Sequence, residues 1–318
     1  MKLSLSIVAS WAWGTSLIVG MQIAQQKGLF AWGIWAGANC LTLALFGALT
    51  RSGFLSRRVF ESKCIKWSAI GIQIFCLIIQ LNILNTIALQ MGAGPVTAYL
   101  FATAIGVIFT LWMYRKGLLM SILTDKYQAI VTGAILLAII GIGWGTGVPT
   151  IQHAESTLSD IAWGVWSACI LFAGPIGDIQ HYQRAEVAGK TNAFAVAAWF
   201  FAIYMGLVVM MSFFEFNFLM NALLILAVIC VTSSTIDSIA VAMHEIANRK
   251  IGTVVALSVC IFWGIFASMG IIDLWSKAGV FRVCFAIGIV SYAAIHSSSS
   301  VLTLQGICRR KMPTPVRK

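Results

Sequence analysis

The sequence has 318 residues, of which 60% are hydrophobic and 10% are charged, and its mean hydropathy is +0.92. Soluble globular proteins carry about 25% charged residues, so this composition excludes that class and predicts a membrane protein. The formal net charge of +11 would suit a nucleic-acid-binding protein if the basic residues shared one surface, but their positions give them another role.

Ten apolar runs, each close to the roughly 20 residues that cross a bilayer, follow one another along the chain. They cover residues 4–26, 29–50, 66–89, 93–113, 127–147, 158–178, 193–213, 218–243, 252–273 and 280–303. We expect a single polytopic membrane domain, residues 1–318, with a tail at residues 304–318.

The basic residues lie mainly in alternate loops between these runs. If the N-terminus is cytoplasmic, every Lys and Arg except Lys27, Lys277 and Arg282 lies on the cytoplasmic side. This is the positive-inside pattern, which sets orientation in the membrane. We therefore expect both termini in the cytoplasm, a bacterial-type plasma (inner) membrane, the lipid bilayer as partner and no nucleic acid. The sequence does not indicate an oligomeric state.

Small and polar residues interrupt the first and sixth runs. Gly14, Thr15, Ser16 and Gly20 stand where a simple span would continue with Leu and Val, and GPIGD occupies Gly174–Asp178. In hydrocarbon a weakened helix persists only against protein or a cavity, where freed carbonyls can bind a cation. The alternative is a packing face, because small residues let membrane helices approach closely.

Five runs followed by five more, with an interrupted run opening each half, predict an inverted repeat. Repeat one would cover residues 4–147 and repeat two residues 158–303. The chain would be unwound near Thr15–Val19 and Gly174–Gly177. The fold class we expect is an all-α membrane protein with ten transmembrane helices, of which the first and sixth are broken.

One carboxylate in a span is a candidate functional group. Asp237 lies in the eighth run within VTSSTIDS, Val231–Ser238, among several hydroxyl side chains. An ionisable residue inside a span marks a functional site by default, and hydroxyl oxygens suit a hard cation. Such hydroxyls also commonly bond back to their own helix. Thr124 or Asp125 can cap the fifth helix.

Features of catalytic chemistry are missing from the sequence. It shows no nucleophile–base pair, no His or Cys spacing for a metal, and no phosphate-binding loop. We therefore expect no enzymatic activity and no nucleotide-driven transport.

Four segments resemble the sodium:solute symporter family, which includes the sodium-coupled proline and sugar symporters. Gly14–Gly28 resembles the first core helix of the family. Leu123–Ile130 resembles the T-D-x-x-Q motif at the start of the fifth core helix. Gly177–Lys190 resembles the Q-R-x-x-x-A stretch that follows the sixth core helix. Ser233–Ser238 resembles the S-T-x-D-S motif of the eighth core helix. The resemblance implies a leucine-transporter-type core, and covers roughly residues 5–247.

The resemblance also implies a set of binding residues. Sodium would be held by the carbonyls of Thr15, Ile18 and Val231 and the hydroxyls of Ser234 and Thr235. Gln22 and Asp178 would lie near the substrate. The chain departs from the family in having Leu17 where proline symporters have Asp, and in lacking helices that flank the ten-helix core.

The function we expect is sodium-coupled symport of a small organic solute by alternating access, with sodium as a transported ion. Asp125 and Asp237 are the candidate coupling residues. Two alternatives remain open: a proton-coupled or uniport carrier, and a transport-inactive sensor or partner subunit with the same fold.

The placement of the basic residues predicts the location of the C-terminus. A reporter fused after Lys318 should be active only in the form that works in the cytoplasm, because the last loop pair obeys the positive-inside pattern. Activity of a periplasmic reporter at that position would contradict the topology and the inverted repeat.

Overall fold

The computed structural model describes the backbone of residues 2–310 and the side chains of residues 2–296. Within these residues the chain is helical, and an isolated bridge between Thr150 and Phe214 is the one β contact. The helices are α1 (Lys2–Trp11), α2 (Gly14–Arg51), α3 (Lys63–Gln90), α4 (Pro95–Gly145), α5 (Leu158–Gly177), α6 (Ile179–Ala188), α7 (Ala193–Met211), α8 (Phe218–Ala247), α9 (Arg249–Phe262) and α10 (Ile271–Arg310), with 3-10 helices η1 (Arg57–Glu61) and η2 (Trp263–Phe266).

Eight helices in this part of the chain are long and apolar enough to cross a membrane, which confirms the all-α, multi-pass prediction. Two of them, α2 and α4, are kinked at Gly28 and Gly117, close to where the sequence predicted loops between spans. The ten-helix inverted repeat itself stays a prediction. Of the expected tail, residues 304–310 belong to α10, and residues 311–318 lie outside the described residues.

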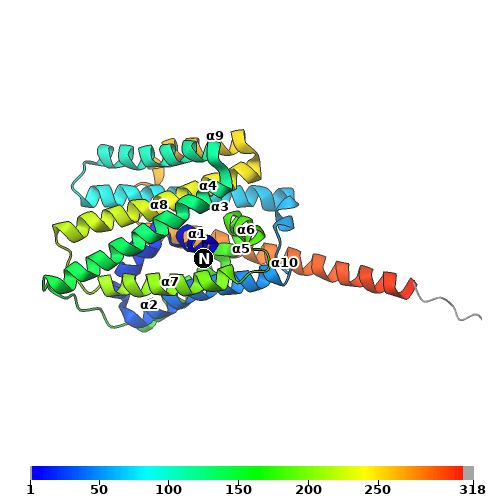
Figure 1. Cartoon of the computed structure of the whole chain (residues 1–318), viewed down its shortest axis with the longest axis horizontal. Helices are drawn as coiled ribbons and strands as arrows, with labels where there is room; N and C mark the ends of the chain where they lie inside the picture. Colours follow the sequence, from blue (N-terminus) through cyan, green and yellow to red (C-terminus); the bar gives the residue numbers. More distant parts are fainter. Residues whose placement is uncertain (1, 311–318) are drawn as a thin grey trace, which may run out of the picture.

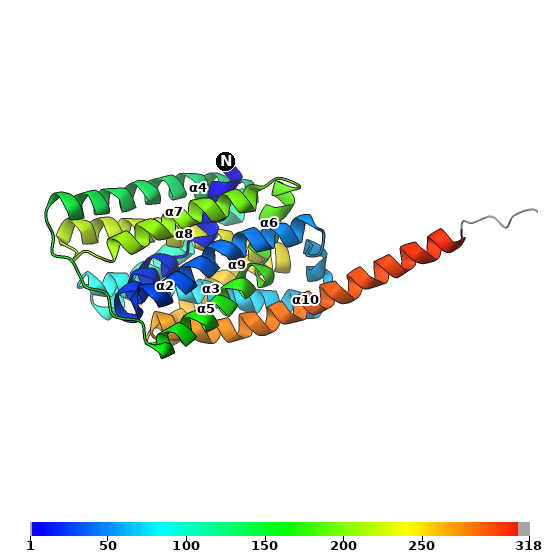
Figure 2. The same cartoon turned by 90° about the horizontal axis from the view of Figure 1, so that it is seen from below.

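Helix α1 lies in the middle of the bundle, with most of its side chains buried (Figure 1). It packs against α4, α7 and α8, and α4 runs along α8. On the other side α2 packs between α5 and α7, and α10 packs on α5 and α3 before extending past the other helices (Figure 2). The serines of this short central helix, Ser4, Ser6 and Ser10, are thus buried among the surrounding helices.

The kinks in α2 and α4 require glycine. Gly28 has φ 82° and ψ 165°, and Gly117 has φ 71° and ψ −169°. Only glycine adopts this region without strain, because other residues clash there through Cβ. At Gly28 the loop before α5 satisfies the freed backbone groups: Ser156 Oγ donates to the Lys27 carbonyl at 2.7 Å, and the Ala31 N–H donates to Ser156 Oγ at 3.2 Å.

The prediction that Thr15–Val19 and Gly174–Gly177 are unwound is wrong, because both stretches are helical and the interruptions of the helices lie beside them. Helix α1 ends at Trp11 and α2 begins at Gly14, so Thr15–Val19 is helical. Helix α5 continues to Gly177, and the break falls at Asp178.

The glycines near the breaks mark close packing instead of unwinding. A Cβ on Gly14 would lie 2.6 Å from Thr232 Oγ1 on α8, and one on Gly174 would lie 2.7 Å from the Trp11 ring. Small residues at these positions let the helix backbones approach closely, which is the packing alternative recognised from the sequence.

Replacing Gly28 by alanine should destabilise the protein more than the same change at Gly117. Both substitutions place Cβ in a region of φ and ψ that costs about 1–3 kcal/mol for non-glycine residues. Gly28→Ala also brings Cβ to 2.4 Å from the Ala154 carbonyl oxygen, whereas Gly117 has no neighbour within 4 Å. Thermal unfolding in detergent measures the difference. Equal decreases in the unfolding temperature of the two variants would show that the loop at Ala154 shifts without cost to accommodate the new Cβ.

Candidate functional site

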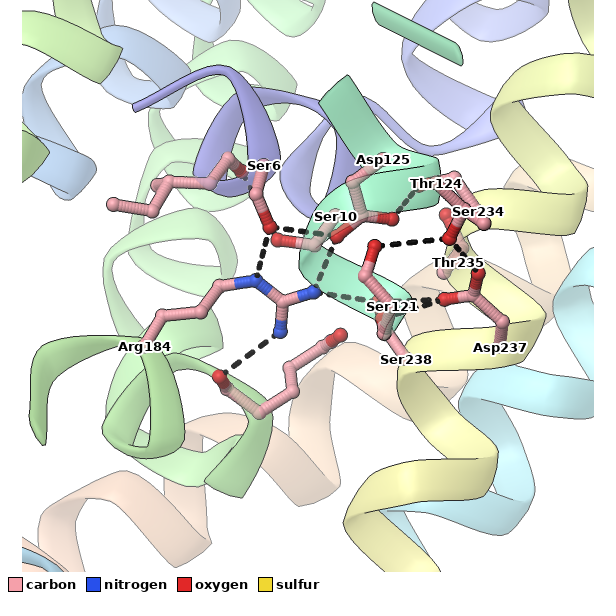
Figure 3. A network of polar contacts seen from close by, with 12 residues as sticks. Ser6, Ser10, Ser121, Thr124, Asp125, Arg184, Ser234, Thr235, Asp237 and Ser238 are labelled. Carbon is pink, nitrogen blue, oxygen red and sulfur yellow. Dashed lines mark hydrogen bonds and ion pairs between the residues drawn. The ribbon is translucent and has the colours of Figure 1, made fainter. Parts of the chain in front are cut away.

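Three buried charged side chains from separate helices meet beside α1 (Figure 3). They are Asp125 of α4, Arg184 of α6 and Asp237 of α8, and each is 0% exposed. We call these three residues the charged cluster. Hydroxyl groups from α1, α4 and α8 surround it, so its chemistry is that of carboxylates, one guanidinium and serine or threonine oxygens.

Arg184 and Asp125 form the ion pair of the cluster, with 2.7 Å between Nη2 and Oδ2. Ser6 Oγ donates to the same carboxylate oxygen at 2.7 Å and accepts from Arg184 Nε at 3.1 Å. Ser234 Oγ donates to Asp125 Oδ1 at 2.6 Å, and Arg184 Nη2 also donates to Ser238 Oγ at 2.8 Å. A buried ion pair is tolerated when further hydrogen bonds satisfy its remaining donors and acceptors, and these bonds do so.

Asp237 receives hydroxyl donors but no ion pair among the described residues. Ser121 Oγ donates to its Oδ1 at 2.8 Å, Thr124 Oγ1 lies 3.1 Å from its Oδ2, and Ser238 Oγ lies 3.2 Å from Oδ1. Ser121 and Thr124 belong to α4, so the carboxylate of α8 is bonded across the contact between these two helices.

The charges of the cluster do not balance. Two carboxylates and one guanidinium leave one negative charge in a region that water does not reach. Burying an uncompensated charge costs several kcal/mol, so such a group takes up a proton or a cation. Hydroxyl and carboxylate oxygens are the ligands that hard cations prefer, and hydroxyl groups can turn from donating to accepting. The arrangement can therefore bind one monovalent cation beside Asp237.

Helix α6 positions Arg184. Asp178 caps this helix: its Oδ1 accepts from the Gln180 N–H at 3.2 Å and from Gln73 Nε2 of α3 at 2.8 Å. The short helix then carries Gln180, Gln183 and Arg184 into the interior, and all three are buried. The cap fixes the start of α6 to α3, and one further turn brings the guanidinium to Asp125.

The sodium ligands implied by the resemblance lie in two places. Thr15 and Ile18 are inside the regular helix α2, where main-chain carbonyls accept from the N–H four residues later. The Val231 carbonyl accepts from Thr235 Oγ1 at 3.1 Å, and Ser234 is bonded to Asp125. Ser234 thus joins the charged cluster, and the five-residue sodium set stays a prediction.

The two predicted substrate residues have different surroundings. Gln22 lines a cavity of about 250 Å³ beside Gln25 and Asn221. Asp178 is buried and bonded to Gln73 and to Gln180 at the start of α6. No hydrogen bond or ion pair joins them, and their role in binding a substrate stays a prediction.

The cap predicted at Thr124 or Asp125 is wrong, because both residues lie inside α4, beyond its kink at Gly117. Asp125 faces Arg184 instead. Sequence reasoning missed Arg184 by counting it as a cytoplasmic loop charge, and it missed Ser6. The signal that could have found Arg184 was electrostatic: a carboxylate within a span, such as Asp237, favours a basic partner, and Arg184 follows the sixth run closely.

No family model and no curated protein matches the chain.

The charge imbalance predicts opposite results for two single substitutions. Arg184→Gln leaves two buried carboxylates without a guanidinium and should cost about 3–5 kcal/mol of stability. Asp237→Asn removes the uncompensated carboxylate, so the stability in sodium-free buffer should stay equal or rise. Adding Asp125→Asn to Arg184→Gln should recover part of the loss. Thermal unfolding in detergent measures all three, and similar losses for both single variants would refute the charge count.

Proposed function

We propose that the protein is a sodium-coupled secondary transporter of a small organic solute. The observation that carries the proposal is the excess negative charge of the buried cluster formed by Asp125, Arg184 and Asp237. In a structural ion pair the two charges balance, whereas a surplus buried carboxylate favours the uptake of a cation or a proton. Intramembrane carboxylates of this kind mark ion pathways.

We place the sodium ion beside Asp237, at the contact between α4 and α8. Its ligands there are the Asp237 carboxylate and the hydroxyl oxygens of Ser121, Thr124 and Ser238, which already lie within hydrogen-bonding distance of that carboxylate. The ion neutralises the surplus charge and holds the two helices together. Its binding therefore favours one packing of the bundle over another, which is what coupling requires.

The cluster also connects the ion to the rest of the molecule. Ser238 accepts a hydrogen bond from Arg184 of α6, and Arg184 donates in turn to Ser6 of α1. Helix α1 ends just before α2 begins, and α6 begins just after α5 ends. These interruptions of the helices allow α1 to move relative to α2 and α6 relative to α5. Moving one sodium ion through a membrane potential supplies about 2.3 kcal/mol per 100 mV for such a movement.

Sodium should stabilise the purified protein, because a ligand stabilises the state that it binds. Thermal unfolding in sodium chloride, compared with choline chloride at equal ionic strength, should show a saturable increase. Ser121→Ala should weaken the sodium response about 10- to 150-fold, the loss expected from one hydrogen bond to a charge. Asp237→Asn should abolish it.

Ser233→Ala is the matched control, because Ser233 lies on the same helix but bonds to the Cys230 carbonyl and Gln128. It should leave the sodium response unchanged. If Thr235→Ala weakens the sodium response and Ser121→Ala does not, the ion is bound instead by the five residues that the family resemblance implies. Stabilisation by low pH without any sodium effect would favour proton coupling. Absence of both responses would leave a protein that does not couple to a cation.

A further inference from the structure

A second buried site lies at the break between α1 and α2. A small cavity of about 20 Å³, the volume of about one water, separates these helices from α5 and α10. Four tryptophans line it, together with the one charged residue Arg282: Trp11, Trp13, Trp35 and Trp275. The four indole rings therefore dominate its walls.

Arg282 brings a positive charge to this cavity from α10. Its side chain is 6% exposed, and the guanidinium carbon lies 4.4 Å from the centre of the Trp13 ring. The hydrogen bond of Arg282 is to Cys76 Sγ, at 2.6 Å from Nη2. Sulfur is a weak acceptor, and a guanidinium has five N–H donors, so most of its hydrogen-bonding capacity is unused within the described residues.

No carboxylate of the described residues forms an ion pair with Arg282. Asp178 is the carboxylate on the adjoining element, since Gly177 before it packs on Phe285, one turn along α10 from Arg282. Its oxygens accept from Gln73 and Gln180 instead. The Trp13 contact offsets part of the cost of burying the guanidinium, but an anion is the partner that a buried arginine requires.

Further donors without partners line the same cavity. The Trp35 indole N–H has no hydrogen-bond partner among the described residues, and that side chain is 3% exposed. Thr15 and Ser16 also line the cavity, and neither hydroxyl forms a hydrogen bond with another described residue. By contrast, the indole N–H groups of Trp11 and Trp13 donate to main-chain carbonyls. The cavity thus offers unused donors, which suit a ligand that accepts hydrogen bonds.

We propose that Arg282 binds the carboxylate group of the transported solute, with the tryptophans around it enclosing the solute's apolar part. This inference rests on the proposed transport function and names the chemical class of its solute. A carboxylate carries one charge, which a single guanidinium neutralises, and its planar pair of oxygens matches the guanidinium fork. A phosphate dianion would leave a second charge in an aromatic pocket. The cavity, at about 20 Å³, must widen to admit the solute.

The test is a thermal-shift and tryptophan-fluorescence titration of the purified full-length protein. The probes are choline salts of small monocarboxylates, from acetate through propionate to benzoate, each compared with its own amide and with inorganic phosphate. Carboxylates should raise the unfolding temperature and change the tryptophan emission in a saturable way, and the amides should not. Arg282→Gln should weaken the response about 10- to 150-fold. Lys277→Gln, which removes an exposed positive charge from the same helix, should leave it unchanged.

Stability without ligand gives an independent readout. Arg282→Met removes a buried charge without a counter-ion, so it should keep or raise the unfolding temperature. A large loss that Asp178→Asn restores would show a structural pair and overturn the proposal. So would a response to phosphate or to amides alone, or to no carboxylate of the series. Titrations in choline chloride and in sodium chloride separate the two proposals. Carboxylate binding without any sodium effect would contradict sodium-coupled transport but not carboxylate binding by Arg282.

Discussion

The ion pair between Arg184 and Asp125 constrains more of this protein than any other contact among its described residues. Both side chains are inaccessible to water, where an isolated charge costs several kcal/mol, so neither helix can shift without leaving its charge unpaired. Ser6 and Ser234 complete the hydrogen bonds of the pair and extend this constraint to α1 and α8. Four helices thereby have one relative position set by electrostatics, while the apolar contacts around them carry no such directional requirement.

The two helix breaks place two buried arginines in opposite situations. After the α5–α6 break, Arg184 lies beside two carboxylates, so the cluster has one surplus negative charge. At the α1–α2 break, Arg282 lies among tryptophans and forms no ion pair with a described residue. A sodium ion and a carboxylate would neutralise these two charges together. Under the two proposals, each ligand neutralises one site, and the bundle with both bound carries no unpaired buried charge at either place.

Hydropathy and the loop charges predicted the multi-pass helical fold, and that level of the prediction is confirmed. The breaks were predicted a few residues from their true positions, because glycine in a membrane helix indicates either unwinding or close packing. The neighbour of Gly174, which is Trp11, decides between these, and it lies far away in the sequence. Asp125 and Asp237 were recognised as candidate coupling residues and Ser234 as a sodium ligand, but the contact of Ser234 with Asp125 was not predicted. Arg184 was missed because a basic residue just after a span resembles a loop charge.

The wide spacing of the cluster along the chain has a consequence for biogenesis. Arg184 is synthesised 59 residues after Asp125, Ser238 follows 54 residues after Arg184, and Ser6 precedes Asp125 by 119 residues. If spans enter the bilayer in the order of synthesis, Asp125 arrives before its counter-ion exists, and an unpaired carboxylate in a membrane is costly. Contacts between such distant residues also form slowly. The contacts of the cluster can therefore be completed only after Ser238 of α8 has been synthesised.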